Sequence, residues 1–165
     1  LALPCSAVKW YRLSAEQGNA SAQYNLGDLY RHGQGAPMNC AEAIKWLRLA
    51  AEQGDVSSQS SLGDLYSWGE DVPMNYAKAI KWYRLAAEQG FAGAQNNLGD
   101  MYRLGLGVPE NDIRAYVWYS VAATQKSPAA RVKRDGVAKL HTPALLGQAQ
   151  QIATKCFESD DQYCD

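Results

Sequence analysis

Long apolar runs and an excess of one charge are both missing from this sequence. No apolar stretch approaches the roughly 18 to 20 residues that a membrane-spanning helix needs, and the mean hydropathy is −0.39. Lys and Arg total 16 against 17 Asp and Glu, a formal charge of −1. We therefore expect no membrane span. We also expect no nucleic-acid partner, because nucleic acid requires an electropositive surface.

Histidine is scarce, which limits metal chemistry. His32 and His141 are the only two histidines, and neither has a second His, Cys or carboxylate at the helical spacing of metal ligands. The Gly-x-Gly pairs at Gly33 and Gly105 lack the preceding strand and the lysine of a phosphate-binding loop. The sequence therefore predicts no metal and no cofactor.

A 36-residue repeat occupies most of the chain. Tryptophan returns at this spacing four times, at Trp10, Trp46, Trp82 and Trp118. The segment Ala-Ala-Glu-Gln-Gly ends at Gly54 and again at Gly90. Repeats of this length are typical of solenoids, in which each unit packs against its neighbours. Because each tryptophan stands beside small alanines on an apolar helix face, we expect all four to pack in the core.

Each unit predicts two helices. In the first, Ala22, Leu26, Leu29 and Tyr30 lie on one apolar face. Gly27 interrupts this helix at a propensity cost of about 1 kcal/mol, which predicts close approach of a neighbouring helix. The expected helices span residues 5–17, 20–32, 41–53, 56–68, 77–89, 92–104, 112–125, 128–140 and 143 to about 156.

Turn chemistry supports these boundaries. Asn39, Asn75 and Asn111 stand where an N-cap side chain accepts from the first amides of the second helix, and Gly54 suits the left-handed position that ends it. Lys126 replaces the corresponding glycine in the last unit. We therefore predict an all-α fold in one solenoid domain, residues 1–165. It comprises a half repeat at 1–19, repeats at 20–55, 56–91 and 92–127, and capping helices with a tail at 128–165.

The repeated motifs also resemble a known family. The run from Ala22 to Tyr30, then Gly33-Gln34-Gly35 and the segment from Ala43 to Gly54, is similar to the SEL-one-like (SLR) repeat, a relative of the tetratricopeptide repeat. The second unit departs at Asp71, where the family has glycine. The resemblance implies a right-handed superhelix of helix pairs whose members serve as adaptors, and it implies no single reaction.

The C-terminal cysteines bear on compartment. The stretch from Thr142 through Cys156 to Cys164 looks like the ending of many exported bacterial members. A Cys156–Cys164 disulfide is feasible and would close a loop of about 9 residues, adding somewhat under 3 kcal/mol; reduced thiols in a cytosolic chain are the alternative. We expect a periplasmic or secreted bacterial protein whose signal peptide is not present in this chain. Pairing of Cys5 with Cys40 stays open.

By resemblance to tetratricopeptide arrays, the first helix of each unit lines a concave groove. The outward positions of these helices are Tyr24, Asp28, Arg31, His32, Ser60, Asp64, Ser67, Trp68, Asn96, Asp100, Arg103 and Leu104. Asp28 with Arg31, and Asp100 with Arg103, stand at the i, i+3 spacing of local surface pairs, whereas Asp64 lacks such a partner. Trp68 is the one tryptophan outside the repeat register, and it serves either as an interaction hot spot or in local packing.

Two functions are weighed. The first is a non-enzymatic adaptor that binds a protein or peptide segment in the groove, with self-association left open. The second is an envelope hydrolase or a modulator of cell-wall enzymes, because weak β-lactam-related activity has been proposed for some members of the resembled family. Ser6-Ala7-Val8-Lys9 fits the S-x-x-K pattern, but the companion S-D-N and K-T-G elements are absent, so we expect no catalysis.

Overall fold

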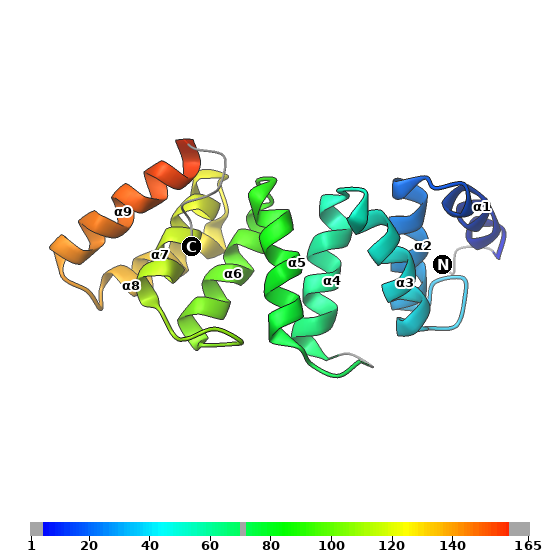
Figure 1. The fold of residues 1–165 in the computed structure, drawn as a ribbon, viewed down its shortest axis with the longest axis horizontal. Helices are drawn as coiled ribbons and strands as arrows, with labels where there is room; N and C mark the ends of the chain where they lie inside the picture. Colours follow the sequence, from blue (N-terminus) through cyan, green and yellow to red (C-terminus); the bar gives the residue numbers. More distant parts are fainter. Residues whose placement is uncertain (1–4, 70–71, 159–165) are drawn as a thin grey trace. The chain divides into compact units, whose positions relative to one another are not determined.

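The computed structural model describes residues 5–69 and 72–158, and the side chains of residues 8–69 and 72–155. All regular structure in these ranges is helical (Figure 1). The helices are α1 (Cys5–Glu16), α2 (Ala20–His32), α3 (Cys40–Glu52), α4 (Val56–Trp68), α5 (Tyr76–Glu88), α6 (Ala92–Leu104), α7 (Asp112–Thr124), α8 (Pro128–Ala138) and α9 (Pro143–Glu158). The all-α prediction is confirmed, and every helix boundary lies within two residues of its expected position.

The chain divides into two compact units between Asn75 and Tyr76. Unit 1 holds α1 to α4, and unit 2 holds α5 to α9. Helices that follow one another in sequence pack together from α1 to α4 in unit 1 and from α5 to α8 in unit 2, and α9 packs on α7. This packing between neighbours is what repeat arrays require, because a single unit cannot bury its apolar face alone.

The helix ends confirm two of the three expected asparagine caps and the expected glycine after α3. Asn39 Oδ1 accepts a hydrogen bond from the Glu42 amide at 3.1 Å, and Asn111 Oδ1 accepts one from the Arg114 amide at 2.9 Å. Gly54 adopts a φ of +91° just after α3. Lys126, which replaces the equivalent glycine after α7, has a φ of +64°. The turn geometry is therefore retained where its favoured residue is lost.

Three buried glutamines hold the helix hairpins together. In each, the side-chain nitrogen donates to the carbonyl of the alanine eight residues earlier, at 3.0 to 3.1 Å. These residues are Gln23, Gln59 and Gln95. The bond links the last turn of one helix to the first turn of the next, so a polar side chain is satisfied in the core.

Gly27 marks a close helix contact, as its position predicts. A Cβ atom there would lie 2.7 Å from Leu47 Cγ and 3.2 Å from the Ala43 carbonyl oxygen. Gly99 has the same role in unit 2, where a Cβ would overlap the ring of Tyr119. Glycine is needed at both positions because α3 and α7 carry a large side chain directly over the helix.

The repeated tryptophans differ in burial. Trp46 is 7% exposed and Trp118 is 2% exposed, and Trp82 is half-buried. The core prediction is wrong for Trp10, which is 73% exposed. Trp46 belongs to a buried cluster with Val8, on the preceding helix pair, whereas no helix precedes α1 among the described residues. An apolar face alone therefore does not ensure burial.

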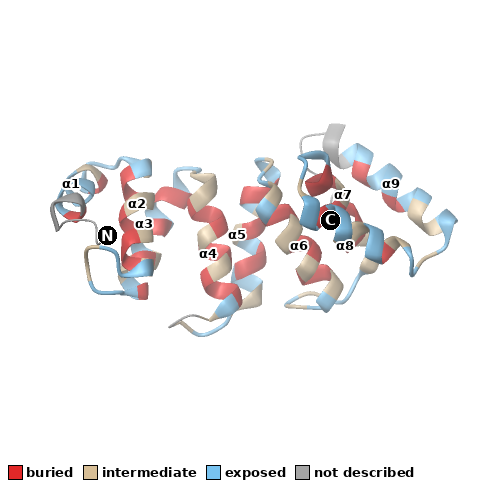
Figure 2. Ribbon diagram, turned by 180° about the vertical axis from the view of Figure 1, so that it is seen from behind, coloured by how far each residue is buried: buried red, intermediate tan, exposed pale blue. Residues whose placement is uncertain are grey.

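Helix α8 continues the repeat beyond its recognisable sequence. Its N-cap, Ser127, stands 36 residues after Phe91, the N-cap of α6. Helix α9 then lies against α7 through Ala149 and Ala153, and most of its other described side chains are exposed (Figure 2). No helix in the described ranges is long and apolar enough to span a membrane.

Candidate interaction surface

Polar and aromatic side chains of α2 and α4 form a connected cluster on the surface of unit 1. We call this cluster the α2–α4 patch. Its members are Tyr24, Asp28, Arg31, His32, Asp64 and Trp68. All six were expected at outward positions, and each is at least partly exposed in the structure.

Arg31 is the centre of the patch. Its Nη1 lies 4.0 Å from Asp64 Oδ2, and only 11% of its side chain is exposed. Its guanidinium carbon lies 5.9 Å from the ring centroid of Trp68, within the range of a cation–π contact. Arg31 therefore connects α2 with α4. Its guanidinium covers part of the Trp68 ring, and Trp68 remains 60% exposed.

The charge partners differ from the local pairs that spacing predicts. Asp64, expected to lack a partner, interacts with Arg31 of the neighbouring helix. That expectation is wrong because i, i+3 spacing reports only pairs within one helix. Asp28 Oδ1 lies 3.2 Å from His32 Nδ1, one helical turn later.

Tyr24 lies at the acidic side of the patch. Partial burial raises the pKa of its hydroxyl, and the nearby Asp28 and Asp55 raise it further, while Arg31 opposes the shift. The phenol is therefore neutral at physiological pH and can donate a hydrogen bond. A partner that binds on this side of the patch can therefore contact one hydrogen-bond donor, the Tyr24 hydroxyl, and the carboxylates of Asp28 and Asp55.

Ser60 and Ser67 do not belong to the exposed surface. Ser60 is 8% exposed and Ser67 is 9% exposed, so the prediction of an outward position is wrong for both. Position 60 is equivalent to Tyr24, whose long side chain reaches solvent, whereas a serine side chain stays below the surface. Side-chain length therefore decides exposure at this register position.

In unit 2 the equivalent positions surround Asp100. Asp100 Oδ1 accepts a hydrogen bond from the Tyr119 hydroxyl at 2.8 Å. Asp100 Oδ2 forms an ion pair with Lys133 Nζ at 2.6 Å. The pKa of Tyr119 lies well above its ordinary value, mainly because the hydroxyl is buried and secondly because it is hydrogen-bonded to Asp100. Asp100 is therefore held by α7 and α8, contacts that reasoning along a single helix does not reveal.

The remaining expected residues of unit 2 are less organised. Asn96 and Arg103 are partly exposed and Leu104 is 62% exposed. The Asn96 side-chain nitrogen lies 3.5 Å from Asn97 Oδ1, and its Oδ1 is buried with no partner among the described residues. This surface offers fewer anchors than the α2–α4 patch.

Several expectations fall on residues that the structure does not describe. The side chains of Ser6, Cys5 and Cys156, and all of Cys164 and Asp71, lie outside the described part of the chain. The Cys156–Cys164 disulfide therefore stays a prediction, and the pairing of Cys5 with Cys40 stays open. Lys9 is exposed on α1, and Cys40 is buried at the start of α3. The described residues contain no group of three or more potential metal ligands from His, Cys, Asp and Glu.

Together, the paired helices, the repeated caps and glutamine bonds, and the varied surface define an α-helical repeat solenoid. The model of the Sel1 repeat matches residues 6–19, 20–55, 56–91 and 92–127. The chain belongs to the Sel1 repeat family. Proteins of this family generally mediate protein–protein interactions.

Solved structures agree with this assignment. A Sel1 repeat protein from Oxalobacter formigenes is 38% identical with a TM-score of 0.75, over 80% of this chain and 54% of its own. A protective antigen with an SLR fold, c5321 of uropathogenic Escherichia coli, is 36% identical with a TM-score of 0.74, over 90% of this chain and 36% of its own. The chain thus spans about half of one relative and about a third of the other. No curated protein matches it. Nothing in these comparisons supports the hydrolase alternative.

Proposed function

We propose that this chain is an adaptor that binds a segment of a partner protein through the α2–α4 patch. The exposed indole of Trp68, held against Arg31, is the observation that carries the proposal. Tryptophan and arginine dominate hot spots because they combine large contact area with directed hydrogen bonding. Asn96, Asp100 and Arg103, the partner-binding residues expected in unit 2, stay predictions.

The chemistry of the patch favours one kind of segment. An apolar or aromatic side chain of the partner would cover Trp68, and a basic side chain would approach Asp28 and the Tyr24 hydroxyl. By sequence, residues 1–75 carry five basic and eight acidic side chains, a net charge of −3. This acidic surface favours association with a basic segment, and high salt should weaken it.

The test compares two exposed tryptophans. Partners captured from envelope extract are quantified for the parent, for Trp68→Ala and for Trp10→Ala, the control with a comparably exposed indole outside the patch. A hot-spot tryptophan contributes about 2 kcal/mol or more, so Trp68→Ala should weaken binding at least about 30-fold. Trp10→Ala should bind as the parent does. Unchanged binding by Trp68→Ala, or no specific partner of the parent, would contradict the proposal.

We also propose an exported, bacterial location. Its support is the Cys156 and Cys164 spacing, together with the bacterial sources of the two solved relatives. Mass spectrometry after alkylation without reduction checks this on protein purified from its source. Protection of both thiols supports the proposal, and alkylation of both contradicts it.

A further inference from the structure

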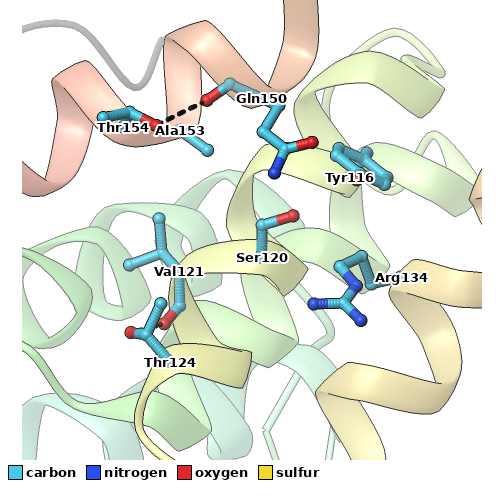
Figure 3. A pocket seen from close by; sticks show the side chains of 8 residues that line it. All are labelled: Tyr116, Ser120, Val121, Thr124, Arg134, Gln150, Ala153 and Thr154. Atoms are coloured by element: carbon cyan, nitrogen blue, oxygen red, sulfur yellow. Dashed lines mark hydrogen bonds between the residues drawn. The ribbon is translucent and has the colours of Figure 1, made fainter. Parts of the chain in front are cut away.

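A cavity of about 260 Å³ lies in unit 2 between α7, α8 and α9 (Figure 3). Its lining residues are Tyr116, Ser120, Val121, Thr124, Arg134, Gln150, Ala153 and Thr154. Sites for drug-sized ligands usually measure about 300 to 1,000 Å³, so this cavity suits a smaller group, of the size of one amino acid.

The 36-residue register explains why α7 has room for this cavity. The equivalent face of α3 carries Arg48, Leu49 and Glu52, all exposed to solvent. On α7 the same positions hold Ser120, Val121 and Thr124, each a smaller residue. The smaller side chains allow α9 to cover α7, and the cavity is the space left between them. This packing explains the size of the residues but not their remaining polarity.

Ser120 is the first polar feature that packing does not explain. Its Oγ is completely buried and has no hydrogen-bond partner among the described residues. The other two hydroxyl groups of small lining residues are satisfied, since Thr124 bonds the Val121 carbonyl and Thr154 bonds the Gln150 carbonyl. A buried polar group without a partner is destabilising, so a ligand oxygen that the Ser120 hydroxyl meets by rotating about its Cα–Cβ bond would satisfy it.

Arg134 is the second feature. It stands at the register position of Leu26, Leu62 and Leu98, each of which is 0% exposed. Arg134 Nε and Nη2 donate to Asp135 Oδ1 at 2.9 and 2.7 Å. A guanidinium has five N–H donors, so this pairing leaves donors for a second acceptor. In Figure 3 the guanidinium lies on the cavity side of α8, facing α7.

The other lining groups complete a defined chemistry. Figure 3 shows the Gln150 amide projecting from α9 toward Ser120 and Tyr116. Ala153 is buried and Val121 is 8% exposed, which provides an apolar wall beside these donors. No Asp or Glu is among the described lining residues. The cavity therefore matches a small ligand with an anionic acceptor at one end and a short apolar group at the other.

We propose that this cavity binds the carboxylate of one amino-acid-sized unit with an apolar side chain, either a free acid or the last residue of a peptide. The carboxylate accepts hydrogen bonds from Arg134 and Ser120, and the apolar group contacts Val121 and Ala153. Charge-assisted bonds of this kind are stronger than neutral ones. The site is separate from the α2–α4 patch and does not depend on the adaptor proposal.

Binding of small probes tests the proposed chemistry. The ¹⁵N-labelled full chain is titrated with N-acetyl-leucine and with N-acetyl-leucine amide while amide resonances are followed. The acid should produce saturable shifts at residues of α7, α8 and α9. The uncharged amide should bind at least about tenfold more weakly, because it cannot form charge-assisted bonds. No saturable shift with the acid, or equal affinity for the amide, would overturn the proposal.

A second titration distinguishes the two sources of the carboxylate. A short peptide ending in leucine is compared with N-acetyl-leucine and with its own amidated form. Tighter binding of the free-carboxylate peptide than of N-acetyl-leucine identifies a peptide end as the ligand. Weaker binding of that peptide identifies a free acid. Measurable binding of the peptide that is unchanged in its amidated form would contradict the site.

Variants that restore the repeat provide the residue-level test. Arg134→Leu returns the leucine of the other units, and Ser120→Arg returns their arginine and fills the cavity, so both should keep the helical circular dichroism of the parent. Each should weaken binding of N-acetyl-leucine at least about tenfold. Arg131→Gln, an exposed change on α8 outside the lining, should bind as the parent. Parent-like binding by Arg134→Leu, or equal loss in Arg131→Gln, would refute the assignment.

Discussion

The two tryptophans of unit 1 that share a register position provide a direct test of how the array is stabilised. Trp10 and Trp46 occupy equivalent positions 36 residues apart, yet Trp10 is 73% exposed and Trp46 is 7% exposed. We predict that Trp46→Ala strongly destabilises the protein and that Trp10→Ala does not. Sequence similarity alone would predict equal effects.

The magnitudes follow from buried area. A buried tryptophan removes about 150 to 250 Å² from water, and at about 25 cal/mol per Å² this corresponds to roughly 4 to 6 kcal/mol. Core substitutions of Trp by Ala cost about 3 to 5 kcal/mol, and we expect Trp46→Ala in that range. Trp46 also donates from Nε1 to Glu42 Oε2 at 3.1 Å. With about a quarter of its surface buried, Trp10 should contribute about 1 kcal/mol.

Urea denaturation followed by circular dichroism at 222 nm measures both free energies of unfolding. Fluorescence of the remaining tryptophans tests whether the two units unfold together, because separate transitions would invalidate a two-state free energy. A loss of equal size in Trp10→Ala and Trp46→Ala would refute the reasoning, since it would show that both indoles are buried in solution.

Three further outcomes are expected. Lys126→Gly should stabilise the protein by about 0.5 to 1 kcal/mol, because a left-handed conformation strains residues with a Cβ. Gly54→Ala should destabilise the protein through the backbone alone, because Gly54 has a φ of +91° and nothing lies within 4 Å of the added Cβ. Unchanged thermal midpoints in the two variants would contradict this account of backbone strain. Tyr119→Phe should cost about 1 kcal/mol near neutral pH through loss of the bond to Asp100. The folded state raises the pKa of Tyr119, so the contribution of its hydroxyl to stability is complete below about pH 10 and declines as pH rises above that value. The urea midpoints of the parent and Tyr119→Phe should therefore converge at high pH. A difference that stays constant with pH would contradict the role given to the Tyr119 hydroxyl.

The helices and their caps could be predicted because they depend on local signals. Asn39 and Asn111 cap their helices through bonds that span three residues, and the 36-residue period places each apolar face. Gly27 was recognisable as a contact site since a glycine inside a helix needs a packing reason. Such features require only a short window of sequence and its repetition.

The candidate surfaces depend on contacts between helices, and here sequence reasoning was incomplete. It located Tyr24, Asp28, Arg31 and Trp68 but paired the charges along single helices. The contact of Arg31 with Asp64 joins residues 33 positions apart, and no periodic pattern specifies which surface side chain will bridge two helices. Side-chain length was a second source of error, because Ser60 is buried where Tyr24 reaches solvent.

The amino-acid sequence by itself determined the repeat, the nine helices among the described residues, their caps and the family, because these follow from periodicity and local hydrogen bonding. Only the tertiary structure decided which equivalent residues are buried and which polar groups meet. Trp10 differs from Trp46 through the presence of a preceding helix pair. Arg134 and Ser120 line one cavity because α9 packs on α7. Helix α9 lies outside the repeated units, so the 36-residue period does not predict this contact.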